Sequence, residues 1–204
     1  MKLHWSPKSP YVRKVVVVAH ELGCLERMEL VRTVAAMARP NETLMRDNPL
    51  SKIPALVLDD GRALFDSIVI CEYLDARFGG SLFPREGELR WQSLRWNALG
   101  DGMLDALILW RNERERPEVQ QSPALMAAFE HKVRACLQML DQSATELSET
   151  SFTIGHVSLA CALGYLDFRF ESLHWRHIAP ALAAWEARIA QRPSLSSSTP
   201  TLTE

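Results

Sequence analysis

Short apolar runs alternate with helically spaced apolar positions along the first part of the chain, up to about residue 78. This pattern predicts strands at the short runs and helices where the period is near 3.6. The predicted elements are a strand at Met1–Trp5, a helix at Tyr11–Leu22, a strand at Met28–Thr33, a short helix or turn at Pro40–Asp47, strands at Ala55–Leu58 and Arg62–Phe65, and a helix that Ser67 opens and Gly79-Gly80 ends. A βαβ unit gives a parallel pair, and the turn at Asp59–Gly61 adds antiparallel strands. We therefore expect a small mixed sheet with helices on both faces.

The rest of the chain has the spacing of helices only. The predicted elements are one long helix or a kinked pair at Leu89–Arg116, a helix opened by Ser122-Pro123, a polar loop at Thr145–Thr153, a helix that Ser158 starts, a last helix at Pro180–Gln191, and a Ser/Thr-rich tail at Ser194–Glu204 that we expect to be mobile. The predicted fold is thus an α/β domain at 1–79, a linker at 80–87 and an all-helical domain at 88–204.

Composition narrows the class of protein. The formal net charge is −2 and both signs are mixed along the chain, which argues against a nucleic-acid-binding surface. The four cysteines are far apart and form no zinc-binding spacing, so we expect buried thiols in a reducing compartment and no metal. No secretory leader and no apolar run long enough to span a bilayer is evident. We expect a cytoplasmic location.

A first candidate for chemistry lies at Ser6–Arg13, where a strand ends and a helix begins. Ser9 falls at the N-cap position and Pro10 suits the first turn. Capping alone explains a serine at this place. The same geometry also stabilises an anion such as a thiolate, because free N–H groups and the positive end of the helix dipole lie beside the hydroxyl.

Two further stretches suggest a ligand site. Pro54 directly precedes a strand, which an edge strand tolerates without any function. Alternatively, a cis Ile53–Pro54 bond would turn the Ile53 N–H and C=O outward to pair with a peptide ligand. Asp66 and Ser67 open a helix and are good caps, but the same pair also suits an amino-acid end: the N–H groups and Ser67 would take a carboxylate and Asp66 an ammonium.

The order and spacing of these stretches resemble the cytosolic glutathione transferases over nearly the whole chain. The motifs that carry the resemblance are Ser9-Pro10-Tyr11-Val12-Arg13-Lys14-Val15, Asn48-Pro49-x-x-Lys52-Ile53-Pro54-Ala55-Leu56 and Asp66-Ser67-x-x-Ile70-x-Glu72-Tyr73-Leu74. The resemblance is greatest to bacterial members with a Ser-Pro-Tyr/Phe start. It implies a thioredoxin-like N-terminal domain, a helical C-terminal domain and glutathione as co-substrate.

The resemblance also implies roles for individual residues. Ile53, before a cis Pro54, would bind the cysteinyl backbone of glutathione, and Lys52 would lie near the glycyl carboxylate. Asp66 and Ser67 would hold the γ-glutamyl end. Asp101-Gly102 is similar to the Asp-Gly by which some members reach the γ-glutamyl group bound by the neighbouring subunit. A homodimer is therefore expected.

Catalysis in this family consists largely of holding glutathione as the thiolate nucleophile. Ser9 is the candidate for the stabilising hydroxyl, because Ser9-Pro10-Tyr11 matches the Ser/Cys-Pro-aromatic motif, and Ser6 is the runner-up. The electrophile pocket cannot be defined from sequence; its suggested lining is His4, Trp5, Pro7, Trp110 and Arg111, with core packing the simpler explanation for both tryptophans.

One departure from the family pattern concerns folding. Members often open a buried helix with a Ser/Thr cap and an Asp three residues later, whereas the stretch Ser158–Cys161 keeps the cap and ends in a cysteine.

Three functions stay open on sequence alone. The first is a transferase that conjugates glutathione to small electrophiles. The second uses the thiolate for peroxide reduction, dehalogenation or isomerisation. The third is a binding module that keeps this fold without turnover.

Overall fold

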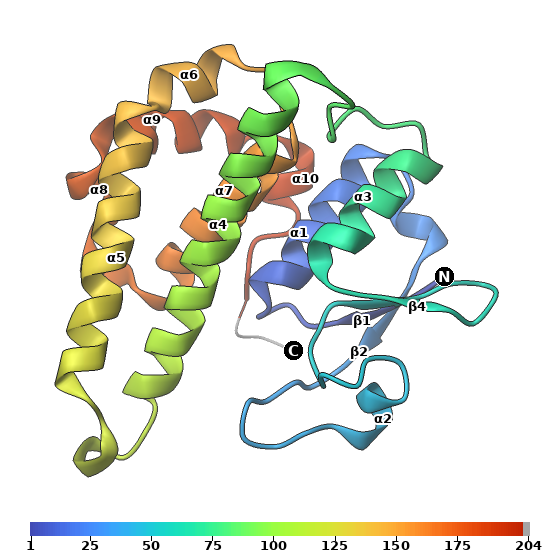
Figure 1. Ribbon diagram of the computed structural model, residues 1–204, viewed down its shortest axis with the longest axis horizontal. Coiled ribbons are helices and arrows are strands. Elements are labelled where there is room, and N and C mark those ends of the chain that lie inside the picture. The colour runs from blue at the N-terminus through green and yellow to red at the C-terminus, as the bar shows by residue number, and fades with distance from the viewer. Residues whose placement is uncertain (202–204) are drawn as a thin grey trace. The chain divides into compact units, whose positions relative to one another are not determined.

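The computed structural model describes residues 1–201 and contains two compact units (Figure 1). The first unit comprises Met1–Arg90 together with the segment that begins at Ser194. The second comprises Trp91–Pro193. The predicted domain limits at 79 and 88 stay a prediction.

A four-stranded mixed sheet forms the centre of the first unit. β1 (Lys2–Trp5), β2 (Glu29–Arg32), β3 (Ala55–Val57) and β4 (Ala63–Leu64) lie in the order β2-β1-β3-β4. β1 is parallel to β2 and antiparallel to β3, and β3 is antiparallel to β4. Helices α1 (Pro10–Glu21) and α3 (Ser67–Arg77) pack against each other over one face, while α2 (Glu42–Met45) lies on the other (Figure 1). This arrangement confirms the predicted thioredoxin-like domain.

Apolar residues at helical spacing hold α1 against the sheet. Val12, Val15 and Val18 are fully buried, as is Leu3 of β1. Burying a valine or leucine side chain contributes about 1.5–3 kcal/mol, so this stripe fixes the helix on the strand that precedes it. Gly23 follows α1 with φ +62°, the left-handed conformation expected after a helix end. The packing of these valines with Leu3 fixes the start of α1 relative to the end of β1.

The second unit is helical, as predicted. Its elements are α4 (Gly87–Arg114, beginning in the first unit), a 3₁₀ turn at Glu118–Gln120, α5 (Pro123–Gln142), α6 (Ala144–Glu149), α7 (Ile154–Arg169), a 3₁₀ turn at Glu171–Leu173, α8 (Trp175–Ile178), α9 (Pro180–Ile189) and α10 (Pro193–Ser196, crossing back into the first unit); a further 3₁₀ turn, Leu25–Arg27, belongs to the first unit. Helix α7 is buried along most of its length.

Two glycines allow α4 and α7 to cross closely. A Cβ at Gly100 would lie 2.6 Å from the Ser158 hydroxyl and 2.8 Å from its carbonyl carbon. A Cβ at Gly155 would lie 2.7 Å from the Cβ of Trp96. Both distances are too short for a side chain, so glycine is required at each place if the helices are to approach this far.

The predicted start of α7 is wrong. The helix begins at Ile154 with Thr153 as its N-cap, and Ser158 lies inside it, fully buried. Thr153 and His156 form the capping box, so His156 and not Cys161 occupies the position where the family often has Asp. The predicted loop at Thr145–Thr153 is also partly wrong, because α6 extends to Glu149 with Leu147 buried.

The predicted mobile tail is wrong as far as the structure describes it. Leu195 in α10 is 2% exposed, and the Arg13 guanidinium donates to the Leu195 carbonyl at 3.1 Å and to the Ser198 hydroxyl at 3.4 Å. Ser194 donates to the Glu21 carboxylate. The segment Ser194–Thr201 is thus attached to α1, and the rest of the predicted tail, 202–204, lies outside the described residues. Within residues 1–201, we find no helix both long and apolar enough to cross a bilayer.

Candidate glutathione site

The strand order brings the predicted N-terminal motifs to one edge of the sheet. β1 and β4 both run antiparallel to β3, so the ends of β1 and β4 and the beginning of β3 lie at the same edge. The segments at this edge are Ser6–Ser9 after β1, Ile53-Pro54 before β3, and Asp66-Ser67 after β4. The register pairs His4 with Ala55, so Pro54 and Trp5 are the next residues along. Motifs separated by about 57 residues of sequence are therefore neighbours on one edge.

Ser9 caps α1 as predicted. Its backbone is extended, with φ −91° and ψ 117°, and its hydroxyl oxygen accepts from the Val12 N–H at 3.3 Å. Since the oxygen is the acceptor, the hydroxyl hydrogen is available to donate to a ligand. Pro10 occupies the first turn.

Ser6, the runner-up, has a different environment. Its hydroxyl oxygen accepts from the Arg32 guanidinium at 3.0 Å and from the Lys8 N–H at 3.4 Å. Arg32 also lies over the Trp5 ring, 5.6 Å from its centroid. Both serines can therefore donate a hydrogen bond to a thiolate, Ser9 with a helix N-terminus beside it and Ser6 with a guanidinium.

The loop before β3 presents main-chain groups without partners. The Ile53–Pro54 bond is cis, as predicted. Within residues 1–201, neither the N–H nor the C=O of Ile53 is hydrogen-bonded, and the Lys52 ammonium is exposed without an ion pair. Backbone groups left unpaired beside a strand are suited to bind an extended peptide.

Asn48 gives this loop its shape. Its side chain is 1% exposed; the amide donates to the Lys52 carbonyl at 2.8 Å, and the amide oxygen accepts from the Leu50 N–H at 3.1 Å. Ser51 has φ +53°, and its hydroxyl accepts from the Asn41 N–H at 2.8 Å. The loop that carries Lys52 and Ile53 is held by its own side chains.

Asp66 and Ser67 open α3 as predicted. Asp66 is the N-cap, and its carboxylate accepts from the Ile68 N–H at 3.2 Å while remaining exposed. Ser67 is 3% exposed, yet its hydroxyl has no hydrogen-bond partner among the described residues. The hydroxyl can therefore both donate to and accept from a ligand at the start of α3.

Asp101 lies in the second unit, on α4. Its carboxylate accepts from the Ser158 hydroxyl at 2.8 Å and from the Asn97 side chain at 3.2 Å. These contacts fix its rotamer.

The predicted pocket lining is corrected at His4. This side chain is 3% exposed and both ring nitrogens are hydrogen-bonded, Nδ1 with the Thr33 hydroxyl at 2.8 Å and Nε2 with the Asp47 carboxylate at 2.7 Å. His4 is therefore not available to line a pocket. The His4 hydrogen bond is the main reason that the pKa of Asp47 is lowered.

The other suggested lining residues are placed as follows. Trp5 and Pro7 are half-buried at the edge of the first unit. In the second unit, Trp110 is buried against Phe170, with ring centroids 4.7 Å apart, and the Arg111 guanidinium donates to the Tyr165 hydroxyl at 3.3 Å. Core packing thus accounts for Trp110.

The contacts of Arg32, Thr33 and Asp47 were not predicted from the sequence. Each joins residues 26 to 43 positions apart, and no local pattern marks them. The only local signal is Asn48-Pro49, which indicates a turn after α2.

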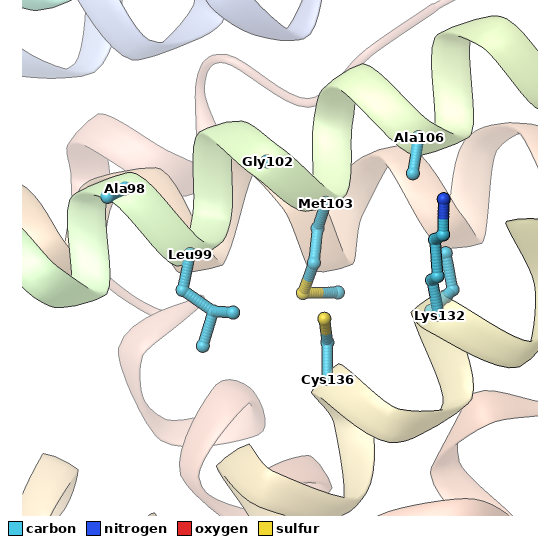
Figure 2. A pocket seen from close by; sticks show the side chains of 8 residues that line it. Ala98, Leu99, Gly102, Met103, Ala106, Lys132 and Cys136 are labelled. Carbon is cyan, nitrogen blue, oxygen red and sulfur yellow. The ribbon is translucent and has the colours of Figure 1, made fainter.

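The second unit has a hollow between α4 and α5 with a volume of about 290 Å³ (Figure 2). Met103 and Cys136 point toward one another across it, and Lys132 lies at one end (Figure 2). Its lining is mainly apolar, which does not suit a metal. Among the described residues, no three His, Cys, Asp or Glu side chains could share a metal ion.

Comparison with known proteins agrees with these features. Residues 8–77 match the Glutathione S-transferase, N-terminal domain, and residues 120–203 match the Glutathione S-transferase, C-terminal domain. A glutathione transferase family member from Pseudomonas fluorescens Pf-5, crystallised with glutathione, is 44% identical over 98% of this chain and 99% of its own, with a TM-score of 0.95. Another structure of a family member from that strain, with S-(propanoic acid)-glutathione, is 42% identical over 99% of this chain and 100% of its own, with a TM-score of 0.91.

A curated relative extends the similarity to a further organism. The uncharacterized GST-like protein YibF of Escherichia coli K12 is 29% identical over 203 residues, 98% of both chains. With family matches in both halves and 44% identity across nearly the whole length, this chain belongs to the glutathione S-transferase family.

Proposed function

We propose that this protein is a glutathione transferase that binds glutathione at the sheet edge and activates it as the thiolate. The observation that carries the proposal is the set of groups at that edge without a partner among the described residues, namely the Ile53 main chain, the Lys52 ammonium and the Ser67 hydroxyl. They lie on segments that the strand order brings to the same edge of the sheet. The glutathione-bound relatives support this assignment.

Each group has a proposed role. The Ile53 N–H and C=O, before cis Pro54, would pair with the cysteinyl residue of glutathione. Lys52 would lie near the glycyl carboxylate, and Asp66 and Ser67 would hold the γ-glutamyl end. Asp101 would reach the glutathione of a neighbouring subunit in a homodimer.

The cysteines and the N-terminal motif support two further assignments. All four cysteines are free thiols, which supports a cytoplasmic location. The Ser9-Pro10-Tyr11 start supports a place among the bacterial members with a Ser-Pro-Tyr/Phe motif.

Ser9 is the proposed thiolate stabiliser. Lowering the pKa of a thiol by one unit needs ~1.4 kcal/mol of preference for the thiolate. A charge-assisted hydrogen bond contributes about 1.5–3 kcal/mol and a helix N-terminus about 0.3–1 kcal/mol, enough for one to two units. Ser6 stays the alternative, because the Arg32 guanidinium and the main-chain N–H of Lys8 both donate to its hydroxyl oxygen and polarise it.

The relative with S-(propanoic acid)-glutathione supports electrophiles that carry a carboxylate. Addition of the glutathione sulfur to the β-carbon of an α,β-unsaturated acid forms such a thioether; the C=C bond is saturated and a proton goes to the α-carbon. Arg32, exposed beside Ser6 and without a carboxylate partner among the described residues, is the cation that would attract this group.

This refinement predicts a charge-dependent effect of Arg32→Gln. We expect kcat/KM for acrylate to fall about 10-fold or more, as loss of a charge-assisted contact implies, with little change for uncharged acrylamide. An equal fall for both substrates would assign Arg32 to the thiolate and not to the electrophile.

Calorimetric titration with glutathione tests the central proposal. Wild-type protein should bind saturably, and Asp66→Ala and Ser67→Ala should lose binding. Asp66→Asn keeps the cap while removing the charge, so its loss of affinity would exclude a folding defect. No binding at millimolar glutathione would overturn the proposal.

A substrate panel then separates the remaining functions. Conjugation without peroxide reduction, dehalogenation or isomerisation supports the transferase. The reverse pattern supports the alternative thiolate chemistry, and tight glutathione binding with none of these activities supports a non-catalytic binding module.

A further inference from the structure

A polar network around the buried His4 side chain joins three segments of the first unit. His4 on β1 contacts Thr33, just after β2, and Asp47, just after α2. The Lys2 ammonium also reaches the Asp47 carboxylate, at 3.2 Å. The catalytic proposal uses none of these side chains.

The partners determine which atoms of the network carry hydrogen. The Asp47 carboxylate can only accept, so Nε2 of His4 donates to it. The Thr33 hydroxyl is within hydrogen-bond distance of both Nδ1, at 2.8 Å, and the Val31 carbonyl, at 3.0 Å. Both ring nitrogens are thus engaged, which holds the imidazole between the end of β2 and the segment after α2.

His4 contacts both ends of the segment Asp47–Ala55, the loop that carries Lys52 and Ile53. Its side chain is bonded to Asp47, the first residue of the loop, and its backbone pairs in register with Ala55, where β3 begins. Between these ends, Asn48 spans the turn to Lys52. Ile53, whose main chain is free to bind a ligand, therefore lies in a segment whose two ends both contact His4.

We propose that His4 is a positioning residue that closes the segment Asp47–Ala55, so that Ile53 is held ready to pair with glutathione. This inference rests on the proposed function. If a variant holds the loop in its competent arrangement only about one tenth of the time, the apparent Kd for glutathione rises about tenfold. Binding made equally in the ground and transition states affects KM and leaves kcat nearly unchanged.

Asp47 offers the sharper test, because it is partly exposed and its truncation leaves no large cavity. In Asp47→Ala we expect about a tenfold higher Kd and KM for glutathione and a kcat within about threefold of wild type. Asp47→Asn, which retains an acceptor for Nε2, should recover part of the affinity. Asp60→Ala is the matched control, since it removes a carboxylate paired with Arg62 at the opposite edge of the same sheet.

Hydrogen exchange gives a readout that does not depend on activity. The Asn48, Leu50 and Ser51 amides are hydrogen-bonded within the loop or to α2, so opening the segment would expose them. Without glutathione, peptides covering 47–55 should exchange faster in Asp47→Ala and unchanged in Asp60→Ala.

The outcomes separate this inference from the proposed function. Faster exchange together with weaker glutathione binding supports the role of His4. Unchanged exchange, or faster exchange with wild-type affinity, overturns it while the proposed function stands. Absence of glutathione binding in the wild-type protein overturns the proposed function, and the role of His4 in it falls as well.

Discussion

Ser9 and Ser122 occupy the same local structure in different units. Each is an N-cap followed by proline, and each hydroxyl accepts from the N–H three residues later at 3.3 Å. As helix caps they are equivalent. Only Ser9 lies at the sheet edge with Ile53 and Ser67. Comparing alanine variants of the two serines therefore separates an effect on bound glutathione from the loss of a helix cap.

Ser9→Ala and Ser122→Ala should therefore cost similar stability, about 1 kcal/mol each. Only Ser9→Ala should raise the thiol pKa of bound glutathione, by one to two units as estimated above from the hydrogen bond and the helix end. Ultraviolet absorbance of the bound thiolate against pH measures this shift. If Ser6→Ala raises the pKa and Ser9→Ala does not, the stabilising serine is Ser6.

At the residue scale, sequence predicted what local chemistry determines. Ser9, Asp66 and Ser67 were identified because capping depends on a few neighbouring residues. The same reasoning placed His4 in a pocket, since nothing near it in sequence shows that Asp47, 43 residues away, accepts its Nε2 hydrogen. The assignment of Ser9, Asp66 and Ser67 to glutathione binding stays a proposal.

Among the elements, α7 has an unusual cap. The His156 Nδ1 accepts from the Thr153 N–H at 3.1 Å, and its Nε2 lies 3.1 Å from the Leu147 carbonyl, to which it donates. The ring is therefore neutral. Burial lowers the pKa of His156, Leu147 opposes this shift, and Arg192 adds to it.

This cap predicts acid sensitivity of the second unit. Because the folded pKa lies below the ordinary 6.5, the contribution is complete above pH 6.5 and is lost as the pH falls through the folded value. The loss is at most ~1.4 kcal/mol per pH unit. His156→Gln, which suits a capping box without titrating, should remove this pH dependence.

Urea unfolding between pH 7.5 and 5, followed by tryptophan fluorescence, measures the effect, since Trp96 and Trp185 both pack on His156. His131→Gln, an exposed position on α5, is the control and should behave as wild type. Equal loss of stability in wild type and His156→Gln would contradict the assignment.

Sequence located most elements but misplaced the start of α7, for a physical reason. The helix is buried on nearly all sides, so its residues lack the polar face that marks helix phase and ends. Ser158 looked like a cap, but it packs on Gly100 and donates to Asp101 instead. The α4 helix has buried and exposed residues along its whole length, and it was predicted to within two residues at each end.

Over the whole molecule, the first unit is discontinuous in sequence. Residues 91–193 form the second unit, and the segment from Ser194 then returns to α1. A polar, Ser/Thr-rich composition indicated a mobile tail, because Leu195, the buried apolar residue in its described part, carries no periodic signal. Local pattern does not reveal a contact with Arg13, 182 residues earlier.

Leu195→Ala should destabilise the first unit by about 2–5 kcal/mol, the usual cost of truncating a buried leucine. Hydrogen exchange of peptides from α1 measures this, and those amides should exchange faster. Val34→Ala, at a position that is 68% exposed in the same unit, should change stability by less than about 0.5 kcal/mol. Equal exchange in the two variants would show that Leu195 does not anchor the segment.

The return of residues 194–201 to α1 has a consequence for synthesis of the protein. A chain leaves the ribosome in order, at about 5–20 residues per second, so the sheet and α1 emerge several seconds before their last packing partner. During translation, the surface of α1 that residues 194–201 cover therefore stays exposed until the whole second unit has been synthesised. A nascent chain stalled before residue 194 should be more readily cleaved by protease in α1 than one released after it.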